Sequence, residues 1–173
     1  MLHSQQRATQ EQLLVQRADA LSLAVDREIS AAMRVLEGLA TSKYLDTGDL
    51  RQFHEQATRV LKAHGGWEPL VLTDVSRRQA VNTRFPFGAP LPRVNSPFIE
   101  EVFNTKRPVV SDLFWGTAVK TPLLAVGVPV IRAGEIRYTL AAGASPGFLA
   151  ELRRSRSCPP VGSRPSSTGT RPS

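Results

Sequence analysis

The amino-acid sequence predicts an α+β fold in which a long N-terminal helix packs on a five-stranded antiparallel sheet with short helices. Three observations lead to this prediction. Apolar residues recur at helical spacing through the first 40 positions, strand-like apolar runs follow from residue 68 onward, and turn-forming residues separate those runs. The length of 173 residues, with 41% hydrophobic and 21% charged side chains, suits one globular domain.

The first predicted element is an amphipathic helix from about Glu11 to Ala40. Its apolar residues follow one another in steps of three and four: Leu14, Ala18, Leu21, Val25, Ile29, Ala32, Leu36 and Leu39. A helix of about 30 residues is roughly 45 Å long, which exceeds the width of a small core. The apolar face is therefore expected either to pack in the core of its own domain or to form a weak homodimer, because the pattern is too short to specify a coiled coil.

A second helix is predicted between two loops. Residues Lys43 to Gly48 are expected to form a loop, after which the side chain of Asp49 caps a helix that ends at Gly65 and Gly66. The residues predicted for its inner face are Leu50, Phe53, Ala57, Val60 and Leu61.

The periodicity then changes to that of strands. Glu68 to Thr73 and Gln79 to Thr83 are predicted to pair as a hairpin through a turn at Asp74 to Arg77. Phe85 to Asn95 contains too many helix and strand breakers for a regular element, so it is expected to form a loop that crosses the sheet. Those breakers are Pro86, Gly88, Pro90 and Pro92.

A short helix is predicted at Pro97 to Thr105, with Ser96 as its cap and Pro108 after its end. Three strands complete the sheet, and the helices are expected to lie together on one side of it. The predicted strands are Val109 to Trp115, Leu123 to Arg132 and Ile136 to Ala142, with a tight turn at Ala133 and Gly134. Ser145 and Pro146 repeat the cap pattern before a last helix at Gly147 to Arg153.

The C-terminal segment from Arg153 to Ser173 has a different composition. It holds six Ser, four Pro and five Arg, with Cys158 and Val161 as its hydrophobic residues. Such a segment has too little apolar surface to form a core, so it is predicted to be disordered. Two origins stay open, a natural basic linker or the product of reading a GC-rich gene out of frame.

The charge is concentrated in that tail. The chain carries a formal charge of +7, but residues 151–173 contribute five arginines and one acid, which leaves +3 for the rest. A single cysteine excludes an internal disulfide. No run of apolar residues is long enough to span a membrane, and the first twelve residues are too polar for a signal peptide. The chain as written is therefore expected to be soluble and cytoplasmic.

Residues that could support catalysis do not form a convincing pattern, so no enzymatic activity, cofactor or metal is expected. His3, His54 and His64 are scattered and lack a neighbouring cysteine. Glu100 and Glu101 are adjacent on the short helix, which favours a stabilising interaction with the helix dipole over a catalytic pair. The glycines lack the spacing of phosphate-binding loops.

Six segments, taken in order, resemble a Cache domain, the extracytoplasmic PAS-like sensor of bacterial histidine kinases and chemoreceptors. They are LSLAVDREISAAMRVLEGLATSKYL, GDLRQFHEQATRVLKAHGGW, LVLTDVSRRQAVNT, RFPFGAPLP, IEEVFNTKRPVVSDLFWG and LLAVGVPVIRAGEIRYTLAAGASPGFLAEL. The resemblance covers about Leu13 to Leu152. It implies a signalling-type helix at 1–40, a PAS-like sensor domain at 41–152 on which that helix packs, and a tail at 153–173.

The resemblance also implies a ligand-sensing module on the periplasmic side of the inner membrane. The transmembrane and kinase regions of such receptors are missing, so the chain is interpreted as a fragment of a two-component or chemoreceptor protein. One departure lies in the hairpin turn, where the family usually has Gly and this chain has Arg77. A positive φ at a non-Gly residue costs about 1 kcal/mol, so Arg77→Gly is predicted to stabilise the domain by about that much if the last position of the turn has a positive φ.

A PAS-like sheet curves around a cavity, and four residues are predicted to bind a ligand there: Asn82, Arg84, Trp115 and Tyr138. Amide, guanidinium, aromatic and hydroxyl groups suit a small anionic or carboxylate metabolite, with Arg84 as its anchor. The alternative for each residue is a structural role, with Trp115 and Tyr138 in the core and Arg84 in solvent.

Two classes of function follow from the sequence. The favoured one is a small-molecule sensor module. The alternative is a basic interaction protein that binds nucleic acid or anionic lipid through its Arg-rich tail, although the modest charge of the body argues against nucleic acid.

Overall fold

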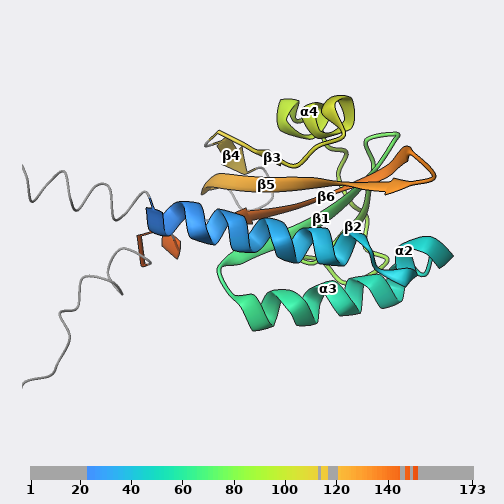
Figure 1. The fold of residues 1–173 in the computed structure, drawn as a ribbon. Helices are drawn as coiled ribbons and strands as arrows, with labels where there is room; N and C mark the ends of the chain where they lie inside the picture. The colour runs from blue at the N-terminus through green and yellow to red at the C-terminus, as the bar shows by residue number, and fades with distance from the viewer. Residues whose placement is uncertain (1–22, 113, 117–120, 145–146, 149, 152–173) are drawn as a thin grey trace, which may run out of the picture.

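The computed structural model describes residues 23–112, 114–116, 121–144, 147–148 and 150–151, and it has the predicted α+β architecture (Figure 1). Several sequence-based predictions concern residues outside these ranges. The first part of the N-terminal helix, the cap at Ser145 and Pro146, and the tail at 153–173 lie outside the described residues.

An antiparallel sheet forms the centre of the domain. Its strands run in the order β2-β1-β6-β5-β3, and a short strand β4 pairs with β5 outside this order. The strands are β1 (Trp67–Asp74), β2 (Gln79–Asn82), β3 (Val109–Val110), β4 (Phe114–Gly116), β5 (Thr121–Arg132) and β6 (Glu135–Ala144). Ala133 and Gly134 join β5 to β6 with φ angles of 50° and 78°, so the predicted two-residue turn is confirmed.

The strand predicted at Val109 to Trp115 is two strands, so that prediction was wrong in detail. Val109 pairs with Gly127, whereas Phe114 pairs with Leu123 farther along the same neighbour. Between them the Ser111 N–H donates to the Ala125 carbonyl at 2.8 Å, and the Ser111 hydroxyl accepts the Ala125 N–H at 2.8 Å. In the hydrogen-bond ladder between the strands, the Ser111 hydroxyl takes the place of a backbone carbonyl. The regular backbone pairing with β5 is therefore interrupted at Ser111.

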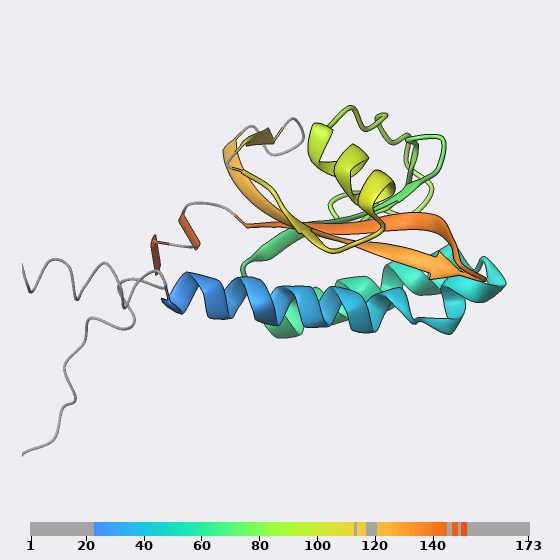
Figure 2. The same cartoon turned by 45° about the horizontal axis from the view of Figure 1, so that its top comes forward.

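The N-terminal helix (residues 23–40 in the described part) and α3 (Leu50–His64) cover one face of the sheet (Figures 1 and 2). The predicted cap is confirmed, because Asp49 Oδ1 accepts the Gln52 N–H at 3.1 Å. The main core lies between these helices and the sheet. It includes Ala32, Leu36, Leu39, Phe53, Ala57, Leu61, Leu70, Leu72, Val126, Val128, Val130 and Leu140.

The loop predicted at Lys43 to Gly48 contains a short helix, α2 (Lys43–Thr47). The Ser42 hydroxyl accepts the Tyr44 N–H at 3.4 Å, and Gly48 ends the helix in the left-handed conformation with φ 75°. The prediction was wrong because the serine cap and the glycine stop bracket only five residues, too few for a hydrophobic period to be visible.

Helix α4 (Pro97–Thr105) has the predicted bounds but lies on the opposite face of the sheet (Figure 1). The expectation that all helices share one side was therefore wrong. The reason is visible in β5, where a Cβ at Gly127 would lie 2.7 Å from Phe98 Cζ. The missing side chain lets α4 pack directly on this face.

Ser96 and Pro97 stand at the predicted cap and first helical positions of α4, but the hydrogen bonds at the two ends were not predicted. The side chain of Ser96 makes no capping hydrogen bond, and its backbone carbonyl accepts the Ile99 and Glu100 N–H groups instead. The helix ends at Thr105 as predicted, and the C-cap residue Lys106 has φ 54° and donates its N–H to the Val102 carbonyl at 3.0 Å. Lys has no preference for the left-handed conformation, so this C-cap could not be predicted from the residue type.

Candidate functional site

A cavity of about 710 Å³ lies on the face of the sheet that carries α4. Strands β1, β2, β5 and β6 form its floor, residues 93–99 and Glu101 form one side, and residues 110–112 form another. Its volume is in the range of small-molecule sites. Alanine and glycine at Ala125, Ala141 and Gly143 line the floor, and their small side chains leave this space open.

Alternation along the strands separates the cavity from the main core. On β5, Val126 and Val128 belong to the main core, whereas Ala125 and Leu123 line the cavity. This is the two-residue period of a strand with both faces covered.

Three buried polar residues belong to the cavity wall: Asn82, Thr73 and Ser111, whose hydroxyl accepts the Ala125 N–H. Asn82 is 2% exposed; its Nδ2 donates to Gln79 Oε1 at 2.8 Å, and its Oδ1 accepts the Arg84 N–H at 3.0 Å. The Asn82 amide thus keeps one N–H for a ligand. Thr73 is fully buried, and its hydroxyl has no hydrogen-bond partner among the described residues.

The unpartnered Thr73 hydroxyl has a neighbour of the same kind. Thr139 on β6 is the cross-strand partner of Thr73, is fully buried, and likewise has no hydrogen-bond partner for its hydroxyl within the described parts of the chain. Buried hydroxyls are nearly always hydrogen-bonded, and leaving one unpaired costs about 1 to 3 kcal/mol. Thr73, which lines the cavity, therefore has unused hydrogen-bonding capacity, and Thr139 lies beside it in the sheet.

Charged residues of both signs lie at the cavity rim. Arg93, Glu101 and Asp112 are exposed and contribute to the lining. Neither acid forms a salt bridge with another described residue. The rim can therefore contact an anionic group at one point and a cationic group at another.

An ion pair holds α4 over the sheet. Arg77, in the β1–β2 turn, donates through Nε and Nη2 to the two carboxylate oxygens of Glu100, and its guanidinium lies 3.9 Å from the centre of the Phe103 ring. The hydrogen bond from Arg77 lowers the pKa of Glu100 and raises that of Arg77. The Val94 N–H also donates to the Arg77 carbonyl at 3.1 Å, so the turn anchors the loop that leads into α4.

Sequence reasoning missed this ion pair. It assigned Glu100 with Glu101 to the helix dipole and treated Arg77 only as a strained substitute for Gly. The φ of Arg77 is 62°, so the positive φ is present. The partner could not be found, because 23 residues separate Arg77 from Glu100 and no local pattern joins them.

The four predicted ligand-binding residues are not brought together. Asn82 lines the cavity, whereas Arg84 is exposed and Tyr138 packs, half-buried, against the main core on the other face. The backbone of Trp115 pairs with Pro122, and its side chain lies outside the described part of the structure. A binding role for these residues remains a prediction. Thr73 was not anticipated, since a Thr within a strand carries no functional signal.

Two further kinds of feature were sought in the part of the chain that the structure describes. No group of three His, Cys, Asp or Glu side chains is arranged to hold a metal ion. No helix there has the length and apolar character needed to cross a bilayer.

No family model matches the sequence, and no curated protein is significantly similar to it. Solved structures are similar in fold. The ligand-binding domain of the Pseudomonas fluorescens chemoreceptor CtaA in complex with L-serine has a TM-score of 0.67 at 13% identity, over 84% of this chain and 63% of that one. The sensor domain of the Vibrio cholerae histidine kinase DctB has a TM-score of 0.65 at 9% identity, over 80% and 57%.

The sensor domain of Escherichia coli DcuS has a TM-score of 0.62 at 17% identity, over 76% of this chain and 98% of that one. This chain spans less than two thirds of the chemoreceptor and DctB domains but nearly all of the DcuS domain. The fold is therefore that of the sensor domains of bacterial chemoreceptors and histidine kinases, as the resemblance to Cache domains predicted.

Proposed function

We propose that this chain is a small-molecule sensor module, not an enzyme, and that its ligand binds in the cavity between the sheet and α4. The observation that carries the proposal is the fully buried, unpartnered Thr73 hydroxyl in the wall of a 710 Å³ cavity. A ligand that accepts a hydrogen bond there would remove an existing penalty, which is a source of both affinity and selectivity.

The ligand is proposed to be a small carboxylate metabolite, with amino acids as the first candidates. The Thr73 hydroxyl and the free N–H of Asn82 are donors that suit a carboxylate. Asp112 and Glu101 at the rim suit an ammonium group. The similarity to a chemoreceptor domain that was solved with L-serine supports this class.

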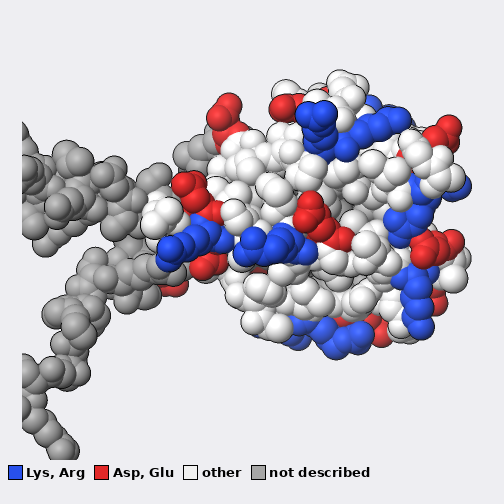
Figure 3. All heavy atoms as spheres, in the orientation of Figure 1, with Lys and Arg blue, Asp and Glu red and all other residues white. Residues whose placement is uncertain are grey.

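The larger context is also a proposal. The module would belong to a two-component or chemoreceptor signalling protein, with residues 1–40 as the signalling helix and a weak homodimer along Leu14, Ala18, Leu21 and Val25. The alternative of nucleic-acid or lipid binding rests on the Arg-rich tail, which lies outside the described residues, and the face drawn in Figure 3 has Lys and Arg interspersed with Asp and Glu.

A thermal-shift screen of amino acids and organic acids tests the proposal, because a ligand that binds only the folded state raises the melting temperature. Hits are then titrated against Thr73→Val, with Thr58→Val as control. Thr58 lies on α3, and its hydroxyl donates to the His54 carbonyl in the same helix. We expect Thr73→Val to bind about tenfold more weakly and Thr58→Val to bind normally.

The same titrations test the sequence-based prediction that Arg84 anchors the ligand. If Arg84→Ala abolishes binding while Thr73→Val has no effect, the ligand lies outside the cavity wall described here. If no amino acid or organic acid raises the melting temperature, the proposed ligand class is wrong.

A further inference from the structure

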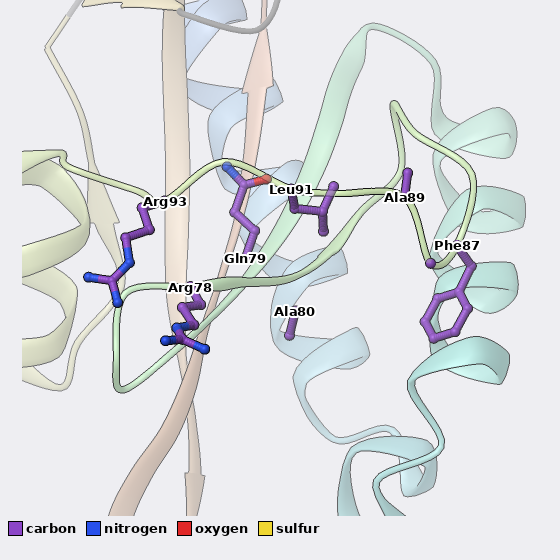
Figure 4. A pocket seen from close by; sticks show the side chains of 8 residues that line it. Arg78, Gln79, Ala80, Phe87, Ala89, Leu91 and Arg93 are labelled. Atoms are coloured by element: carbon purple, nitrogen blue, oxygen red, sulfur yellow. The ribbon is translucent and has the colours of Figure 1, made fainter.

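A second cavity lies at the edge of the sheet, between the start of β2 and the loop that follows it (Figure 4). Its volume is about 430 Å³. It shares only Gln79 and Arg93 with the larger cavity. We call it the edge cavity, and its wall is formed by residues 78–80, 87–89, 91 and 93.

Two arginines lie opposite each other at one end of the edge cavity. Arg78 and Arg93 form an isolated antiparallel bridge, which places their side chains on facing segments of backbone. Figure 4 shows both guanidinium groups at the same end. Both residues are exposed, neither side chain has an ion-pair or hydrogen-bond partner among the described residues, and no acid contributes to the wall. Arg77 next to them differs, because Glu100 neutralises it.

The remainder of the wall is largely apolar. Ala80, Ala89, Leu91 and Phe87 line it, and Phe87 is 37% exposed. The Phe87 ring is held in place from its other side, since the Arg51 guanidinium lies 4.9 Å from its centre and the His54 ring approaches it edge-on at 6.0 Å. The edge cavity thus has a cationic end and an apolar end.

We propose that the edge cavity is a second binding site, specific for an organic monoanion with an apolar body. The carboxylate would lie between Arg78 and Arg93, and the apolar body would cover Leu91 and Ala80 toward Phe87. Like charges directly opposite each other across a bridge repel, so an anion between them removes a destabilising interaction as well as adding two charge-assisted hydrogen bonds. Burial of the apolar body adds the hydrophobic contribution. The proposal does not depend on the sensor ligand.

Titration of the ¹⁵N-labelled chain with hexanoate, followed by NMR, tests this site. Hexanoate is expected to shift the backbone amide signals of residues 78–80, 87–89, 91 and 93 and the guanidinium signals of Arg78 and Arg93. Acetate lacks the apolar body and hexylammonium lacks the anion, so both should bind far more weakly. Added NaCl should weaken hexanoate binding, because the cationic end is exposed.

Substitutions show whether hexanoate binds in the edge cavity. Arg78→Gln is expected to weaken hexanoate binding about fivefold, in keeping with an exposed charge pair, and the exposed Arg107→Gln outside both cavities should not change it. Thr73→Val should leave hexanoate binding intact even if the sensor ligand no longer binds. Equal binding of hexanoate by Arg78→Gln, or signal changes at Ser111 and Ala141 in the larger cavity in place of residues 87–89, 91 and 93, would overturn the proposal.

Discussion

Replacement of Arg77 by Gly is the sharpest test of how the β1–β2 turn contributes to stability. Arg77 has φ 62°, and strain relief alone would stabilise the Gly variant by about 1 kcal/mol. The same substitution removes the ion pair with Glu100, the contact with the Phe103 ring and the hydrogen bond from Nη1 to the Val75 carbonyl at 2.7 Å. Arg77→Gly therefore stabilises the domain only if the strain that it relieves exceeds the free energy of the interactions that it removes.

The contacts outweigh the strain. The Arg77 and Glu100 side chains are 30% and 45% exposed, so solvent screening limits their ion pair to about 1 kcal/mol even with bidentate geometry. The ring contact adds about 0.5 to 1 kcal/mol. Glycine also increases the entropy of the unfolded chain, which costs about 0.5 to 1 kcal/mol. We therefore expect Arg77→Gly to destabilise the domain by about 1 to 2 kcal/mol, which lowers the melting temperature by about 3 to 6 °C.

Chemical denaturation of the six proteins that make up two double-mutant cycles separates these contributions. In a double-mutant cycle of Arg77→Gly with Glu100→Gln, the coupling energy should be about 1 kcal/mol, whereas the same cycle with the adjacent, exposed Glu101→Gln should give none. A more stable Arg77→Gly variant, or a coupling energy near zero with Glu100, would refute the assignment of this ion pair as the anchor of α4.

Three further outcomes are expected. Because ion pairing lowers the folded-state pKa of Glu100, its stabilising contribution is complete above about pH 4.3 and is lost as the pH falls through that lower pKa, so acid titration of Glu100→Gln should show a smaller loss of stability. Gly127→Ala should destabilise the domain by about 1 to 3 kcal/mol in urea, since its methyl group would lie 2.7 Å from Phe98 Cζ. Gly66→Ala combines φ 75° with a Cβ 2.0 Å from the Phe148 ring, so near-ultraviolet circular dichroism should show displacement of that ring.

Much of the fold could be predicted because its signals are local. Asp49 and Gly65 mark the two ends of α3, and Ala133 with Gly134 marks the β5–β6 turn. Each of these depends on the conformational preference of one or two residues. The split of β3 from β4 could not be predicted in this way, because it depends on which backbone group of Ala125 the Ser111 hydroxyl meets across the sheet.

The candidate site was less predictable, because it depends on which residues the strand pairing brings to the same face of the sheet. Asn82 was found because an amide at the end of a strand is conspicuous. Thr73 was missed, because its importance comes from the face of β1 on which it lies and from its pairing with Thr139, 66 positions later in the chain. Arg84 lies two residues beyond Asn82 and is exposed, so proximity in sequence to a buried site residue did not place it in the cavity.

The alternation along β5 also bears on how this domain could change over evolutionary time. Val126 and Val128 are constrained by close packing against the helices, whereas Leu123 and Ala125, which point to the opposite face of β5, line the cavity and have free volume in front of them. Substitutions at every second position can therefore alter ligand choice with little effect on folding. A library restricted to Leu123, Ala125 and Ala141 should accordingly yield mostly folded proteins with diverse ligand preferences, whereas the same diversity at Val126 and Val128 should mostly unfold the domain.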